Sequence, residues 1–162
     1  MTELRRWDRA MANADLPAPR TVVPIEPALL IAQAFDQAQV TELRHSVGSC
    51  MRSAGLDGQR LDDFVLAVNE LITNAVRHGG GQGWLRLWRH TGEIVCEVAD
   101  HGGGISAQRL SDRSRPAPET AGGWGLWLAR ELSDTMEVDT GPAGTTVRIS
   151  ASVVATRHAG AD

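Results

Sequence analysis

The chain has 162 residues, of which 42% are hydrophobic, and a formal net charge of -4 at pH 7. This length suffices for one domain with a sizeable core and is too short for two. The negative charge argues against a nucleic-acid partner held by bulk charge. Because no apolar stretch reaches the length of a membrane span or a signal core, a cytoplasmic protein is expected. Cys50 and Cys96 lie in apolar sequence surroundings and are expected to be small core residues.

The first part of the chain divides into an arm, an extended segment and a helix. Residues 1–20 are polar and punctuated by proline, and they are predicted to form a flexible arm, although residues 4–14 could form a helical turn or two. Residues 22–35 are predicted to be extended, and Asp36 is placed to cap a helix over about 38–54. A turn over 55–58 follows. We expect one domain over 21–153 and a polar tail over 154–162.

The segment from Leu61 to His78 is predicted to be a helix, because its apolar residues recur at spacings of three and four. Glu70 and Asn74 share its polar face one turn apart, with about 5 to 6 Å between their Cβ atoms. A carboxylate there could accept a proton, and an amide oxygen could complete the ligand shell of an Mg2+ ion. Taken alone, the pair is better explained as two solvated residues of an amphipathic helix.

Two strands near 83–89 and 93–99 are predicted to form a hairpin around Thr91 and Gly92. The second strand ends abruptly at Asp100, in the sequence DHGGG. An Asp at a strand end can accept a hydrogen bond from an exocyclic amine such as that of adenine, and Gly102 and Gly104 would let backbone approach a base. A tight turn whose Asp caps its own loop is the alternative explanation.

A second glycine cluster, made of Gly122, Gly123 and Gly125, precedes an apolar helical pattern. Free backbone N–H groups and the positive end of the helix dipole would face an anion there. Such helix starts also serve as plain packing sites, and the spacing is neither that of a Walker A loop nor that of a dinucleotide-binding fingerprint. Strands near 136–140 and 145–152, separated by a turn over 141–144, complete the domain.

Four motifs therefore follow one another along the chain. They are E-x-x-x-N at Glu70 and Asn74, D-x-G-x-G at 100–104, G-x-G-L at 123–126 and G-T-T at 144–146. In this order they resemble the GHKL, or Bergerat-fold, ATP-binding domain over about residues 22–152. More narrowly, AVNELITNAVRHGG and GGWGLWLARELSD resemble the anti-sigma factor serine/threonine kinases of the RsbW type. The expected fold is an α/β (α+β) two-layer sandwich, in which a mixed, largely antiparallel sheet is covered on one face by three main helices.

The resemblance implies a role for each matching residue. Glu70 would be the catalytic general base toward a protein serine hydroxyl, Asn74 would hold Mg2+, and Asp100 would bind the adenine amino group. Thr146 would help Asp100 through a water, and residues 105–121 would form a short mobile ATP lid. The residues expected to bind ATP are Asn74, His78, Asp100, Gly102, Gly104, Ile105, Gly122, Gly123, Trp124, Gly125, Leu126 and Thr146.

One position departs from the family pattern. Some members place an arginine two residues before the first glycine of G-x-G, where it can neutralise the γ-phosphate, and this chain has Ala121 there. Such an arginine can be worth about a thousandfold or more in rate. Either Arg113 or Arg115 of the lid substitutes for it, or phosphoryl transfer is slow. His101 also replaces a frequent Asn, and Trp124 is unusually large for its place between two glycines.

The resemblance also implies partners, namely a sigma factor and an anti-anti-sigma factor of the STAS type, together with a homodimer and no direct contact with nucleic acid or membrane. A non-catalytic, ATP-gated protein-binding module of the same fold is the alternative. The catalytic domain of a histidine kinase is not expected, because it would need a phosphoacceptor helix pair, and gyrase or MutL-type ATPases are excluded by length. All 16 basic residues are Arg, a bias typical of high-GC genomes such as those of actinobacteria.

Overall fold

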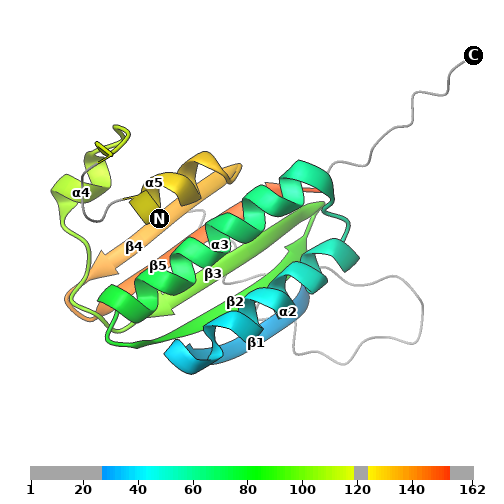
Figure 1. The fold of residues 1–162 in the computed structure, drawn as a ribbon, viewed down its shortest axis with the longest axis horizontal. Coiled ribbons are helices and arrows are strands. Elements are labelled where there is room, and N and C mark those ends of the chain that lie inside the picture. Colours follow the sequence, from blue (N-terminus) through cyan, green and yellow to red (C-terminus); the bar gives the residue numbers. More distant parts are fainter. Residues whose placement is uncertain (1–26, 119–123, 154–162) are drawn as a thin grey trace, which may run out of the picture.

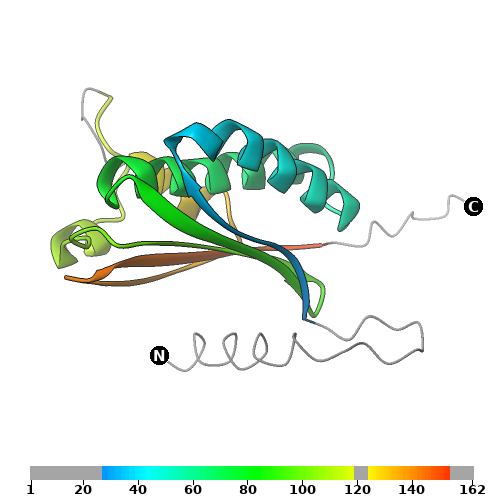
Figure 2. The ribbon, with the colours of Figure 1, turned by 90° about the horizontal axis from the view of Figure 1, so that it is seen from below.

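The computed structural model describes residues 27–118 and 124–153, which form two layers. One layer is a five-stranded sheet with the strand order β1-β2-β3-β5-β4. The helices α2, α3 and α5 form the other layer, and all three lie on the same side of the sheet (Figures 1 and 2). The predicted α+β sandwich with helices on one face is confirmed.

The strands are close to those that the sequence predicts. They are β1 (Ala28–Asp36), β2 (Gln82–His90), β3 (Glu93–Asp100), β4 (Thr135–Gly141) and β5 (Gly144–Ser152). All four pairings between them are antiparallel. The sheet was expected to be mixed and largely antiparallel, and among the described strands the parallel pairing is missing, because β3, β5 and β4 are joined side by side with alternating directions.

The helices also follow the sequence pattern. They are a 3-10 turn η1 (Gln37–Gln39), α2 (Val40–Ser53), α3 (Gly58–His78), α4 (Ala107–Ser111) and α5 (Trp124–Glu131). Asp36 caps η1 as predicted: its Oδ1 accepts a hydrogen bond from the Ala38 N–H at 2.9 Å, and Gln39 Oε1 accepts one from the Asp36 N–H at 2.9 Å. The short helix α4, which lies inside the predicted lid, has no counterpart in the sequence prediction.

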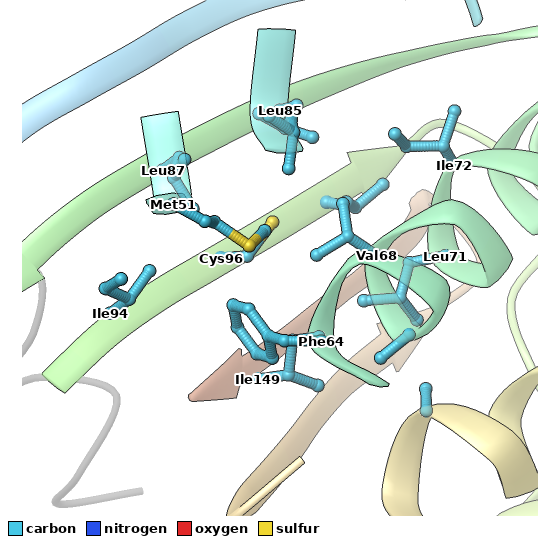
Figure 3. Close-up of a cluster of buried hydrophobic side chains, with 14 of the residues drawn as sticks. Met51, Phe64, Val68, Leu71, Ile72, Leu85, Leu87, Ile94, Cys96 and Ile149 are labelled. Atoms are coloured by element: carbon cyan, nitrogen blue, oxygen red, sulfur yellow. The ribbon is translucent and has the colours of Figure 1, made fainter. Parts of the chain in front are cut away.

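The hydrophobic core lies between the sheet and the helix layer, with α3 over its centre (Figure 3). Phe64, Val68 and Ile72 of α3 project onto Leu85 and Leu87 of β2 and onto β3 and β5. Each of these side chains is almost fully buried, and such burial stabilises a fold by about 1.5 to 3 kcal/mol per large apolar side chain. Because α3 is anchored along this stripe, the residues of its carboxyl-terminal half are held in a fixed place relative to the sheet.

Two further contacts fix the helix against the sheet. Arg60, near the start of α3, forms a 2.9 Å ion pair with Asp134 and donates a hydrogen bond to the Ser152 carbonyl at 2.8 Å. The Ser152 N–H in turn donates to Asp134 Oδ2 at 2.7 Å. No helix within the described ranges is long and apolar enough to cross a membrane.

Candidate functional site

A cavity of about 210 Å³ opens between the carboxyl-terminal half of α3, the ends of β3 and β5, and the segment that carries α4. Its wall brings together elements that are far apart in the sequence. The lining residues are Leu71, Asn74, Ala75, His78, Val98, Asp100, Gly104, Ile105, Arg109, Leu126, Thr145 and Val147.

Asp100 is the last residue of β3 and is held in place by the backbone around it. Its Oδ1 accepts a hydrogen bond from the Gly102 N–H at 2.9 Å and a longer one from the Thr145 N–H at 3.3 Å. The first bond is the local turn that the sequence offered as an alternative, and the second reaches across to β5. Both donors bind the same oxygen atom, so the carboxylate is oriented by Oδ1 and has Oδ2 to offer to a ligand.

Two glycines let the end of α3 approach Asp100 closely. A Cβ atom added at Gly79 would lie 2.4 Å from Asp100 Cβ, and one added at Gly102 would lie 2.5 Å from the His78 carbonyl oxygen. Gly102 is therefore required for packing against α3 and does not itself line the cavity. Gly79 was not predicted, although its place in the string HGGG, directly after the helix, is a typical glycine signal for a helix end.

The polar face of α3 meets the cavity at Asn74 and His78, as the sequence predicts. Asn74 lies against the first turn of α5, since a Cβ at Gly125 would come within 2.7 Å of Asn74 Nδ2. Glu70 is half-buried one turn earlier in α3 and is not among the lining residues. The Glu70 carboxylate is therefore one helical turn away from Asn74 and outside the cavity lining.

The predicted phosphate-binding cluster is described in part. Gly122 and Gly123 lie outside the described residues, as does the position of Ala121. Helix α5 begins at Trp124, where the sequence places a helix start, and Leu126 contributes to the cavity wall. The Trp124 side chain is likewise outside the description.

The threonine at the cavity is Thr145, whereas Thr146 was expected from the resemblance. Along β5 successive side chains point to opposite faces of the sheet, so that Thr145 and Val147 face the helices and Thr146 faces away. Thr145 is buried, and its hydroxyl is 2.8 Å from that of Thr140. A shift of one residue along a strand is enough to exchange the two faces.

The segment that follows Asp100 is held against β4 by Gly104 and Ile105. Gly104, with a φ of +89°, lies so close to β4 that an added Cβ would be 2.6 Å from the Gly141 carbonyl oxygen. The Ile105 N–H donates a hydrogen bond to Thr140 Oγ1 at 2.8 Å. Both residues line the cavity, as predicted from the sequence.

The guanidinium of Arg109, in α4, places a positive charge in the cavity wall. From the sequence, Arg113 or Arg115 was expected to serve this purpose. Arg115 instead stacks its guanidinium over the Trp127 ring, 5.6 Å from the centroid, and neither of the two lines the cavity. Ser106 caps the short helix by accepting a hydrogen bond from the Arg109 N–H. This capping turn fixes the position of the Arg109 backbone.

The rest of the wall is apolar. Leu71 and Ala75 of α3, Val98 of β3 and Val147 of β5 line the cavity beside Asp100. An apolar wall with one hydrogen-bonding group at its edge suits a flat heteroaromatic ring that carries an exocyclic amine. The polar residues Asn74 and Arg109 belong to the same cavity, so an anionic group attached to such a ring would meet an amide and a cation.

Other chemistry has little support in the described part of the chain. Among the described residues, no group of three or more His, Cys, Asp or Glu side chains could hold a metal ion. Burial, reinforced by the neighbouring Glu97 carboxylate, raises the pKa of the Cys96 thiol far above its ordinary value. Cys96 is therefore a core residue, as predicted, and a poor nucleophile.

Comparison with known proteins identifies the domain. The model of the family described as "Histidine kinase-like ATPase domain" matches residues 34–151, which is most of the chain. The chain belongs to this family. It is thus an ATP-binding domain whose family implies an ATP-using, kinase-like activity.

Two solved structures show the same fold as this ATPase domain. The structure of the RsbU and RsbW domains of Rv1364c from Mycobacterium tuberculosis matches with a TM-score of 0.54 and 19% identity, over 75% of this chain and 32% of that one. The histidine kinase AdeS of Acinetobacter baumannii matches with a TM-score of 0.50 and 16% identity, over 94% of this chain and 76% of that one. Our chain thus spans about a third of the mycobacterial protein chain. Among curated protein sequences, no significant match is found.

The cavity of this ATPase domain fits the nucleotide that the family binds. Asp100 provides an acceptor, apolar side chains flank it, and Asn74 and Arg109 supply an amide and a positive charge that suit Mg2+ and phosphates. A bound nucleotide would supply the phosphoryl group, and the residues that line the cavity would bind and orient it.

Proposed function

We propose that this ATPase domain is an anti-sigma regulatory factor of the RsbW type, which sequesters a sigma factor and phosphorylates a serine of a STAS-type anti-anti-sigma partner. The observation that carries the proposal is the arrangement on α3, where Asn74 enters the nucleotide cavity and Glu70 lies one turn away from it. The sequence strings around these residues and around α5 resemble this kinase group. The RsbW-containing structure shares the fold, and at 19% identity it adds nothing about partners.

The nucleotide would be bound from its base to its phosphates along α3. Asp100 Oδ2 would accept a hydrogen bond from the adenine amine, because Oδ1 already accepts two backbone N–H groups. Asn74, at the mouth of α5, would bind Mg2+ together with phosphate oxygens and waters, since an amide oxygen is a ligand that Mg2+ accepts. Arg109 would provide the positive charge that Ala121 does not.

Glu70 would act on the second substrate. In phosphoryl transfer the hydroxyl proton of the partner serine would move to the Glu70 carboxylate while the serine oxygen bonds to the γ-phosphorus and ADP leaves. A general base of this kind must reach the hydroxyl and need not touch the nucleotide. The position of Glu70, beside the cavity but outside its lining, supports this division of labour.

The partners follow from the same proposal. A protein substrate requires that the serine reach Glu70 from outside, and a homodimer is proposed on the resemblance alone. The second candidate, a non-catalytic ATP-gated module, is favoured by one feature of the sequence, namely Ala121 in place of a phosphate-binding arginine. Both candidates bind ATP, and only the kinase transfers the γ-phosphoryl group to a partner serine.

One experiment separates them. The chain is incubated with γ-labelled ATP, Mg2+ and a co-encoded STAS-domain protein, and the partner is analysed for phosphoserine. Glu70→Ala should bind MgATP within a few-fold of wild type and lose transfer, whereas Asn74→Ala should lose the Mg2+-dependent part of the affinity. Glu42→Ala, on the exposed side of α2, is the matched control and should leave both unchanged.

The outcomes are distinct. Labelled phosphoserine in the wild type and none in Glu70→Ala supports the kinase. If the wild type binds MgATP but transfers no phosphoryl group to the partner, the result supports the non-catalytic, ATP-gated module. Transfer at the wild-type rate by Glu70→Ala would show that another group removes the proton.

A further inference from the structure

The face of the sheet opposite α2, α3 and α5 holds a group of side chains that are almost fully withdrawn from solvent. Trp88 and Val95 are both 0% exposed and form a small apolar cluster separate from the main core. Ser150, Arg148 and Glu97 beside them are 2%, 4% and 5% exposed. Such burial is usual for a face that packs against another layer.

The strand register shows that these residues lie on the face away from the helices. Trp88 pairs with Val95, and Val95 pairs with Ser150, so the three form one row across β2, β3 and β5. Their neighbours Leu87 and Cys96 belong to the main core beneath the helices. Because successive side chains of a strand alternate between faces, the row points to the opposite side.

A second row on this face is charged. Arg86 pairs with Glu97, Glu97 with Arg148, and Arg148 with Glu137, which gives alternating charges across four strands. Arg86 Nε donates to Glu97 Oε1 at 2.9 Å, and Arg148 Nε donates to Glu97 Oε2 at 3.0 Å. Both guanidinium groups also lie over the Trp88 ring, at 5.7 and 5.5 Å from its centroid.

The elements that the structure describes do not supply a cover for this face. Figure 2 shows α2, α3 and α5 on the other side of the sheet, and no described helix or strand lies over the rows of Trp88 and Glu97. A row of polar and aromatic groups on an open sheet would remain hydrated, because every side chain would keep one side toward water. The cover must therefore come from outside the described ranges.

The amino-terminal residues have the length and the attachment point for this role. The register places Leu29, at the start of β1, opposite Trp88, so β1 begins beside the buried row. Crossing from β1 to β5 spans about 14 Å, three strand spacings, or about five extended residues. The segment carries Leu4, Trp7 and Met11 at spacings of three and four, whereas residues 154–162 offer Val154 as their one large apolar side chain.

We propose that residues 1–26 dock on the face of the sheet opposite α2, α3 and α5, with Leu4, Trp7 and Met11 placed on the Trp88 row. The face is then an internal contact of the chain. A protein partner has to bind elsewhere, on the helical side or around the cavity.

The test measures proximity in the full chain by paramagnetic relaxation enhancement. A spin label is attached through Ala10→Cys in a Cys50→Ser background. Cys96 stays unlabelled, because it is buried and its thiol pKa is raised. We expect the label to broaden the Trp88 indole N–H signal and the amide signals of nearby outer-face residues, while signals of α3 remain sharp. The matched control carries the label at Ala159→Cys and should leave Trp88 sharp.

Three results would overturn the proposal. One is a sharp Trp88 signal with the label at position 10. Another is broadening in a mixture of isotope-labelled chains without spin label and spin-labelled chains without isotope, which would assign the cover to a second copy. The third is broadening from Ala159→Cys alone, which would assign it to the carboxyl-terminal residues. As an independent check, Leu4→Asp with Met11→Asp should make the Trp88 indole proton exchange with water, and a folded variant that keeps it protected would also contradict the proposal.

Discussion

The adenine contact at Asp100 gives the sharpest prediction, because its two carboxylate oxygens have different tasks. Oδ1 accepts hydrogen bonds from the backbone N–H groups of Gly102 and Thr145. In Asp100→Asn the amide oxygen can take over both bonds only if the amide NH2 points where Oδ2 was. Turning the amide over would place NH2 against two backbone donors. The substituted side chain is therefore expected to present a donor to the adenine amine.

The cost follows from this mismatch. A hydrogen bond to a charged acceptor contributes about 1.5 to 3 kcal/mol, and its loss leaves a donor facing a donor. ATP affinity should therefore fall by about ten- to a hundredfold. Guanine has a carbonyl where adenine has the amine, so the variant should bind GTP better relative to ATP than the wild type does.

The assay is calorimetric titration of wild type and variant with MgATP and MgGTP, after thermal unfolding has shown that the variant is folded. Asp139→Asn serves as the matched control, because Asp139 is an exposed carboxylate of β4 that does not line the cavity. Unchanged ATP affinity in folded Asp100→Asn would refute the assignment of Asp100 to the base.

Three further predictions concern charged groups. Arg109→Ala should lower the affinity for ATP about two- to fivefold, as for an exposed ion pair, and leave the affinity for ADP nearly unchanged. Equal losses of affinity for both nucleotides in calorimetric titrations would contradict a role at the γ-phosphate. Glu97→Ala should lower the free energy of unfolding by about 3 to 5 kcal/mol in chemical denaturation, because it leaves the buried Arg148 guanidinium without its carboxylate; a loss below about 1 kcal/mol, the level of an exposed pair, would contradict this. Partial burial alone would raise the pKa of Asp134, but hydrogen bonds from the Ser152 N–H and Arg60, together with the Arg60 charge, lower it below its ordinary value. The carboxylate then stabilises the fold above the unfolded-state pKa of about 3.9, and the stability difference from Asp134→Asn, measured by thermal unfolding, should vanish as the pH falls through the lower folded pKa, while a constant difference would contradict the linkage.

Short-range patterns in the sequence predicted most of the secondary structure. The spacing of apolar residues predicts α3, and Thr91 and Gly92 form the two-residue turn of the β2–β3 hairpin, with φ of 46° and 74°. The cap at Asp36 depends on a residue three positions away, so the sequence contains it completely. These features depend on interactions between near neighbours, which the order of residues specifies directly.

Cavity residues were predicted from the sequence where a single short motif contains them. Asn74, Asp100 and Gly104 stand in motifs of their own, and all three line the cavity. Thr145 was missed in favour of Thr146, because period-two alternation does not say which of two adjacent threonines faces the helices. The pairing of β5 with β3 and the packing of α3 decide that.

The sequence by itself therefore determined the elements, their order and the motif residues of an ATP-binding domain. Only the tertiary structure decided which side chains meet across long separations. Arg109 of α4 lines the same cavity as Asn74 of α3, and Glu97 binds Arg148 from another strand, 51 residues away. Such contacts depend on strand order and register, which are set by the burial of the whole core and cannot be read from any single stretch of chain.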